Sequence, residues 1–254
     1  MRKLVFILLL FSSLGTFAQA NFSRIAFGIN TGLTAAFTGL SYGLSPDIAG
    51  FDPRKTITIN KDKFFGVTLD YNFTPFITGG IAYNSIFLKD GTDKYNRAFI
   101  SNFSSIEIGG KVALGQFIDF SGSNFLYNIR NVNAGLGLGF ISGTNNVADY
   151  VPGLPQTATT PFPRRMHAND LGKSKFSGVV SFPVSIGYFI NIYNVYEEPK
   201  FVIGADYKVV LTTSDDIDGF NDNPNFFLNK NKDAFTTFGI SIKYLFGPKG
   251  LYYK

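Results

Sequence analysis

The stretch Phe235-Thr-Thr-Phe-Gly-Ile-Ser-Ile-Lys-Tyr-Leu-Phe246 decides the fold, because its residues alternate between two kinds. Every second position is apolar, at Phe238, Ile240, Ile242, Tyr244 and Phe246. The positions between them carry Gly239, Ser241, Lys243 and Leu245. Alternation at a period of two is typical of a strand with a different environment on each face. The stretch fits a strand of a soluble sandwich and equally a strand that crosses a membrane in a closed barrel.

Seven further segments repeat this alternation. The eight segments are 22–37, 63–73, 76–88, 102–116, 126–142, 176–191, 200–212 and 234–246. One face is aliphatic and aromatic throughout, and the other is rich in Gly, Ser, Asn and charged residues. Repeated glycine weakens a strand unless space is short, and space is short inside an eight-stranded barrel. The sequence therefore predicts an all-β fold, an eight-stranded antiparallel transmembrane β-barrel with a closed lumen, rather than a secreted sandwich.

Residues 1–20 have the layout of a cleavable secretory signal peptide. A basic start, Met1-Arg-Lys, is followed by an apolar run and by the small-x-small site Ala18-Gln-Ala20. The apolar run is too short to span a bilayer as a helix. We expect the mature chain to begin at Asn21 and residues 21–254 to form a single domain in the bacterial outer membrane.

Composition excludes several functions. The chain has no Cys, which rules out disulfides and thiolate metal sites. It has 29 Phe and 13 Tyr but only 16% charged residues, a composition that suits a lipid-exposed surface. The basic residues are scattered, so nucleic-acid binding has no support. Outer-membrane lipid and lipopolysaccharide are the expected partners, together with other outer-membrane proteins.

The connections between the segments differ in length. Three of those expected on the extracellular side are long, at 39–62, 143–175 and 213–233. The periplasmic turns are expected to be shorter, with a tight turn at 72–75 and turns of about nine residues near 117–125 and 191–199. Long outer loops and short inner turns are typical of outer-membrane barrels.

The chain resembles the small eight-stranded outer-membrane barrels of Bacteroidetes-type bacteria, the OmpA-like or PorT-like group. The resemblance rests on the signal end Ala18-Gln-Ala20, on residues 71–80 (YNFTPFITGG) and on residues 212–220 (TTSDDIDGF). It covers the whole mature chain and implies the architecture more than an activity.

Two loop clusters carry candidate chemistry. Asp215, Asp216, Asp218 and Asp222 crowd oxygen ligands of the kind that calcium prefers, although their spacing is not that of an EF-hand. The alternative is a solvated, turn-rich acidic loop.

The second cluster surrounds His167, the only histidine. A lipid hydrolase would need a serine beside this base, and no motif supplies one, so an exposed loop residue is the better interpretation. The nearby Arg164, Arg165, Lys173 and Lys175 could meet lipopolysaccharide phosphates or simply keep the loop soluble.

Charged residues also occupy the small, polar face that is expected to line the lumen. They are Arg24, Asp70, Glu107, Lys111, Asp206, Lys208 and Lys243. They could form a selectivity ring around a pore, or ion pairs that satisfy one another inside a filled lumen. We favour the ion pairs, because an unpaired buried charge is too costly. Arg24, Asp70 and Lys243 are expected to be neighbours near the periplasmic end.

Three hypotheses for function follow. The favoured one is a non-enzymatic integral outer-membrane protein with a structural or interaction role, including that of an accessory subunit in a larger export or uptake complex. The alternatives are a small channel and an outer-membrane lipid-modifying enzyme. No cofactor is expected other than the candidate calcium.

Overall fold

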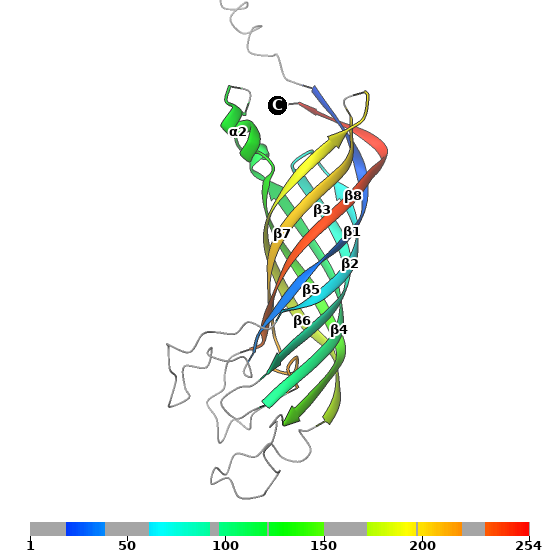
Figure 1. The fold of residues 1–254 in the computed structure, drawn as a ribbon. Coiled ribbons are helices and arrows are strands. Elements are labelled where there is room, and N and C mark those ends of the chain that lie inside the picture. The colour runs from blue at the N-terminus through cyan, green and yellow to red at the C-terminus, as the bar shows by residue number, and fades with distance from the viewer. Residues whose placement is uncertain are drawn as a thin grey trace, which may run out of the picture.

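The chain forms one barrel of eight antiparallel strands (Figure 1). The computed structural model describes residues 19–38, 61–91, 97–120, 122–149, 172–196, 198–219 and 232–253. The strands are β1 (Gln19–Phe37), β2 (Lys61–Asn72), β3 (Ile77–Gly91), β4 (Arg97–Ala113), β5 (Val132–Asp149), β6 (Gly172–Tyr193), β7 (Pro199–Thr212) and β8 (Ala234–Tyr253). Each strand pairs with the next in sequence, and β8 closes the barrel on β1. This confirms the predicted fold class.

Two short helices interrupt the connection between β4 and β5. They are the 3₁₀ helix η1 (Leu114–Gln116) and the α-helix α2 (Asn124–Ile129). Among the described residues, no helix is both long enough and apolar enough to cross a membrane.

The strand boundaries differ from the prediction at both ends of the barrel, and β5, for example, runs to Asp149 rather than to residue 142. The β4–β5 connection is longer than expected, because η1 and α2 take up residues that the alternation had assigned to strands. The β6–β7 turn is shorter, since β6 runs to Tyr193 and β7 begins at Pro199. Strand β8 continues beyond Phe246, because a bulge between Ser23 and Ile25 of β1 restores pairing as far as Tyr253. Gly247 lies in the bulge with φ of 83°, a conformation that glycine adopts without strain.

The two ends of the barrel carry different connections. The start of β1, the end of β8 and the β2–β3, β4–β5 and β6–β7 connections lie at one end, which we call the terminal end (Figure 1). The other four connections lie at the opposite end, the loop end. Three of these are the long connections that the sequence predicts, and the fourth, between Gly91 and Arg97, is short.

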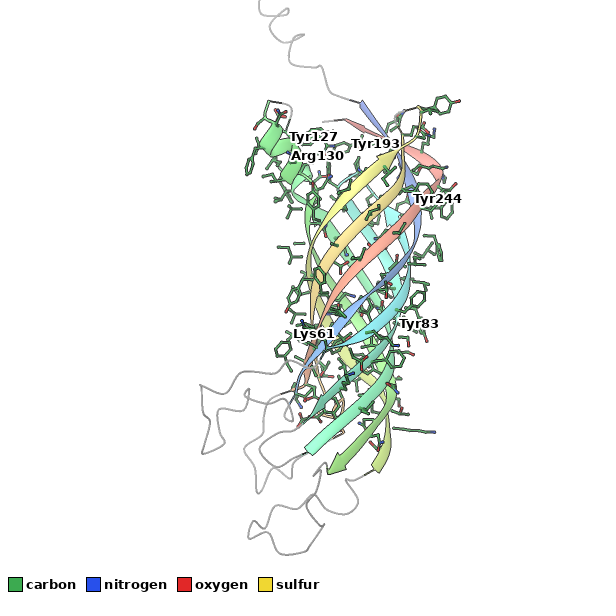
Figure 2. All side chains as sticks on the ribbon, viewed as in Figure 1. Lys61, Tyr83, Tyr127, Arg130, Tyr193 and Tyr244 are labelled. Atoms are coloured by element: carbon green, nitrogen blue, oxygen red, sulfur yellow. The ribbon has the colours of Figure 1, made fainter. Side chains whose placement is uncertain are left out.

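The outer surface of the barrel is an apolar belt. The side chains predicted to face lipid are exposed, and Leu136 of β5 is the clearest example at 70%. The outward positions that follow Phe140 along β5 are polar, at Ser142, Thr144 and Asn146, so the belt stops before the loop end. Tyr83 and Tyr244 lie toward opposite ends of the barrel (Figure 2). A continuous apolar band of this extent on a closed barrel is a lipid-facing surface.

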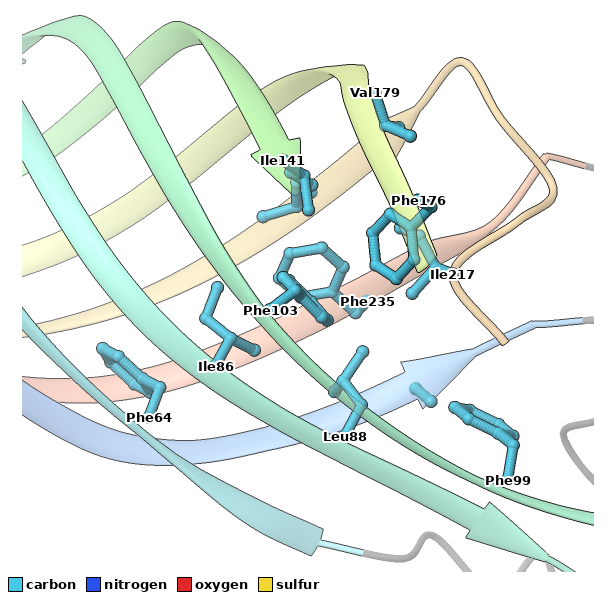
Figure 3. Packing of buried hydrophobic residues seen from close by; sticks show 12 residues of the cluster. Phe64, Ile86, Leu88, Phe99, Phe103, Ile141, Phe176, Val179, Ile217 and Phe235 are labelled. Atoms are coloured by element: carbon cyan, nitrogen blue, oxygen red, sulfur yellow. The ribbon is translucent and has the colours of Figure 1, made fainter. Parts of the chain in front are cut away.

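The inside of the barrel differs from the prediction at the loop end, where large apolar side chains fill it (Figure 3). This plug consists of Ala36, Phe64, Ile86, Leu88, Phe99, Phe103, Ile141, Phe176, Val179, Val210, Ile217 and Phe235. Small polar side chains such as Ser101 and Asn145 are buried beside the plug, and the predicted small and polar lining predominates in the rest of the lumen. The reason is local: near the loop end both faces of a strand are apolar, as at Phe64 and Phe65, where the first is buried and the second exposed.

Candidate functional site: the barrel lumen

The lumen is built in three layers along the barrel axis. The apolar plug closes the loop end, charged side chains occupy the middle, and a cavity of about 200 Å³ reaches the terminal end. The cavity is lined by charged-layer residues such as Asp70 and Lys111 and by Pro75 and Pro199 at the turns. The cavity is therefore open toward the terminal end, and the plug closes it on the side of the loop end.

Six of the seven charged residues named from the sequence come together as three ion pairs. Lys208 Nζ lies 2.6 Å from Glu107 Oε2, and Lys111 Nζ lies 3.8 Å from Asp206 Oδ1. Lys243 pairs with Asp70 across β1. The charges of the layer therefore cancel.

Arg24 lies elsewhere. Its guanidinium donates a hydrogen bond to the Tyr71 hydroxyl at 3.0 Å and stands over the rings of Phe22 and Tyr71. Tyr71 belongs to the exposed outer face, and Arg24 sits within the β1–β8 bulge between Ser23 and Ile25. The bulge breaks the alternation from which the inward position of Arg24 was predicted, so the structure does not bring Arg24 to Asp70.

Glu107 is the most enclosed charge of the layer, with a side chain only 7% exposed. Its Oε1 accepts hydrogen bonds from Asn84 Nδ2 at 3.2 Å and from Ser105 Oγ at 3.1 Å, while Oε2 accepts from Lys208. Asn84 in turn accepts a hydrogen bond from Asn30 Nδ2 at 3.2 Å. The network joins β1, β3, β4 and β7 across the lumen and leaves both carboxylate oxygens of Glu107 satisfied.

Glycines make the room for these side chains. Five of the six paired charges stand directly opposite a glycine in the strand register: Asp70 opposite Gly80, Lys243 opposite Gly28, Lys111 opposite Gly135, Glu107 opposite Gly139 and Asp206 opposite Gly187. A Cβ added at Gly80 would lie 2.2 Å from Asp70 Oδ1, and one at Gly28 would lie 2.7 Å from Lys243 Cγ. The glycines are therefore required by close approach, because a larger residue would collide with the charged chain.

The first part of the β7–β8 connection, Thr213–Gly219, folds back over the plug. Ile217 is fully buried in the apolar cluster beside Phe176 (Figure 3). Asn145 Nδ2 on β5 donates a hydrogen bond to the carbonyl of Asp216 at 2.7 Å. This segment therefore acts as a cover on the plug.

Asp233 holds the cover in place. Its Oδ2 accepts hydrogen bonds from the backbone N–H of Ile217 at 2.8 Å and of Asp218 at 3.3 Å. Its own backbone N–H donates to Ser214 O at 3.2 Å. Burial, together with the nearby carboxylates of Asp218 and Asp215, raises the pKa of Asp233 from 3.8 to about 9. Asp233 is therefore protonated at neutral pH.

Asp233→Asn should change how stability depends on pH. In the wild type, the unfolded state loses its Asp233 proton near pH 3.8 and the folded state keeps it to about pH 9. Stability therefore falls as pH rises through this window, by up to about 1.4 kcal/mol per pH unit. Asn keeps the acceptor oxygen and cannot ionise, so its urea midpoint in detergent micelles should fall less between about pH 5 and about pH 8. Parallel pH profiles for the two proteins would contradict this assignment.

The other loop residues named from the sequence have mixed outcomes. Within the cover, Asp218 is fully buried and Asp216 is exposed, so the stretch is not uniformly a solvated loop. No group of three or more His, Cys, Asp or Glu side chains among the described residues could hold a metal ion. Asp222, Arg164, Arg165 and His167 lie outside the described residues, as does the side chain of Lys173, while Lys175 is exposed at the loop end of β6.

The sequence analysis missed two features: the plug, and the hydrogen bonds by which Asp233 holds the cover. Neighbouring apolar residues within one strand, such as Val209 and Val210, could have signalled the plug, because they indicate a strand with an apolar environment on both faces. Nothing local marks Asp233, since its role depends on residues more than ten positions away.

Comparisons with known proteins give fold-level similarity only. No protein-family model matches the chain, and no curated protein sequence matches it significantly. The chain is similar to the crystal structure of Neisserial surface protein A, with 9% identity, 87% of this chain and 97% of that chain covered, and a TM-score of 0.46. It is also similar to Ail, the attachment invasion locus protein of Yersinia pestis, with 13% identity, 89% and 99% covered, and a TM-score of 0.41.

The class of protein follows from the chain itself. Only helices and closed barrels satisfy every backbone polar group within a bilayer. This chain is a closed barrel of eight strands with an apolar exterior and a lumen of paired charges, the architecture of bacterial outer-membrane barrels. It is an integral outer-membrane β-barrel.

Proposed function

We propose that this chain is a non-enzymatic structural or interaction protein of the outer membrane, with a lumen that does not conduct. The single observation that carries the proposal is the plug, which places large apolar side chains across the loop end of the lumen. On the terminal side of the plug, the charges of the three ion pairs cancel, which argues against a selectivity ring. The terminal end faces the periplasm and the long connections face the outside, as is usual for such barrels.

The purified protein should give no steady conductance above background in planar lipid bilayers, because the plug places large apolar side chains across the lumen. The same preparation should migrate faster in gels unheated than boiled, which verifies that the tested protein is a folded barrel. A stable open level of porin size from heat-modifiable protein would replace this proposal with the channel hypothesis.

The finer proposal is that the barrel is an accessory subunit of a larger export or uptake complex. It is supported by the resemblance to OmpA-like and PorT-like barrels of Bacteroidetes-type bacteria and by β4, β5 and β6, which extend furthest at the loop end (Figure 1). Mild solubilisation of native membranes, purification and identification of stoichiometric companions is the test. Recovery of the chain alone, after crosslinking in intact cells, would leave only the structural role.

Outer-membrane lipid and lipopolysaccharide complete the proposed partners. The apolar belt supports contact with lipid, and the exposed Lys175 supports contact with phosphate groups at the loop end.

Calcium is proposed as a ligand of the acidic stretch from Asp215 to Asp222; because the described carboxylates do not form a metal site by themselves, the proposal depends on Asp222. Binding to the folded form alone stabilises it by mass action, by about 2.7 kcal/mol at a hundredfold excess over Kd. Millimolar calcium should then raise the melting temperature relative to chelator, and Asp216→Asn should reduce the gain. An equal melting temperature in calcium and in chelator would contradict the proposed calcium binding.

A further inference from the structure

The β4–β5 connection, residues 114–131, exposes large aromatic side chains at the terminal end. Phe117 is 76% exposed and Phe125 of α2 is 69% exposed. Helix α2 buries none of its residues. Aromatic surface of this size is costly to leave in water, so a surface that covers it is expected.

The two halves of the connection are held at different places: Gln116 of η1 accepts hydrogen bonds from Thr74 at 3.1 Å and Tyr252 at 3.5 Å across the mouth, and α2 is tied to the lipid-facing side of the rim. The Tyr188 hydroxyl donates to the carbonyl of Asn128 at 3.1 Å, and Tyr188 belongs to the exposed outer face of β6. The backbone N–H of Gly115 donates to Arg130 O at 2.8 Å, which ties the two ends of the connection together. The α2 end of the connection therefore adjoins the apolar belt at Tyr188.

The connection carries one acidic and one basic residue, Asp119 and Arg130, and the place of Arg130 among aromatic rings suits the headgroup region of a bilayer. The Arg130 guanidinium lies 3.4 Å from the centre of the Tyr127 ring and 5.1 Å from that of Phe120. Tyr127 and Arg130 lie near the level of the exposed Tyr193 at the terminal end (Figure 2). Aromatic rings beside a cation are enriched where acyl chains meet phosphates.

We propose that residues 114–120 and 122–131 form an interfacial anchor in the periplasmic phospholipid leaflet. Phe117 and Phe125 enter the boundary between headgroups and acyl chains, and Arg130 faces lipid phosphate. The anchor rests on the proposed function, because it requires the barrel to span the outer membrane. The anchor would set how deeply the terminal end of the barrel sits in the bilayer.

Fluorescence can test the anchor directly, because the chain contains no Trp. Single variants Phe125→Trp and Leu136→Trp are reconstituted in vesicles of phosphatidylethanolamine and phosphatidylglycerol, with bromines placed near the headgroups or deep in the acyl chains. Both emissions should shift to the blue relative to N-acetyltryptophanamide in water. Shallow bromines should quench the Phe125→Trp variant more, and deep bromines should quench the Leu136→Trp variant more.

The two positions separate the possible failures. Quenching at 136 with a water-like, unquenched emission at 125 would overturn the anchor and leave the barrel in the membrane; a periplasmic protein would then be the partner that covers the aromatics. Absence of quenching at both positions would overturn the membrane barrel as well.

A matched pair of variants tests whether lipid contact stabilises the fold. Phe117→Ser with Phe125→Ser should lower the urea midpoint in vesicles, whereas Phe117→Leu with Phe125→Leu should retain most of it. Equal midpoints for the Ser pair and the Leu pair would contradict the anchor.

Discussion

Glu107→Ala should destabilise the folded barrel by about 3 to 5 kcal/mol, because it leaves a buried ammonium without its partner. Lys208 lies 2.6 Å from Glu107, and its side chain is only 14% exposed. Asn84 and Ser105 would lose an acceptor at the same time. The free energy of unfolding is measured by urea titration in micelles, followed by far-ultraviolet circular dichroism.

A double variant separates the charge from the rest of the network. Glu107→Ala combined with Lys208→Met removes both charges, so it should lose less stability than Glu107→Ala alone. Asp206→Ala is a useful companion, because its partner Lys111 is more open, at 38%, and stands farther away, at 3.8 Å. Its cost should be smaller. An effect of Glu107→Ala below about 1 kcal/mol would show that water screens the pair and that the lumen is more hydrated than the contacts indicate.

The sequence predicts the barrel well, because its signal is repeated in every strand. The outward residues of β8, from Phe238 to Phe246, are all exposed as the alternation requires. The signal fails where alternation is broken by something nonlocal. The bulge that contains Arg24 and Gly247 moves Arg24 out of the predicted register, and α2 replaces the expected start of β5.

For the charged layer of the lumen, the sequence predicts which residues take part but not which of them form ion pairs. Inward alternation selects Asp70, Glu107 and Lys208, but the partners depend on which strands face each other across the lumen. Lys243 reaches Asp70 past Gly28 of the intervening strand, a relation that only closure of the barrel creates. The glycines opposite the charges are the best local clue, since each marks where a long side chain must cross.

The apolar plug changes how closure of the lumen is explained. Packing of paired charges was expected to fill the interior, yet the largest buried side chains, such as Phe99 and Phe235, lie on the loop side of the charged layer. Apolar packing has no ionic strength dependence comparable to that of charges. The barrel should therefore stay closed over a wide range of salt concentrations.

Leu136→Lys should cost about 2 to 4 kcal/mol, because Leu136 lies in the middle of the apolar belt of β5, where a lysine would face the bilayer core. The side chain is 70% exposed, so no packing inside the protein is lost and the cost reports lipid contact alone. Ile100→Lys is the matched control. Ile100 is 54% exposed on β4, and the outward Asn102 and Ser104 separate it from the belt. Its cost should stay near zero to about 1 kcal/mol. Both variants are unfolded by urea from phospholipid vesicles and compared with the wild type. A similar small effect at both positions would mean that the outer face is not held in a bilayer, which would remove the basis of the membrane assignment.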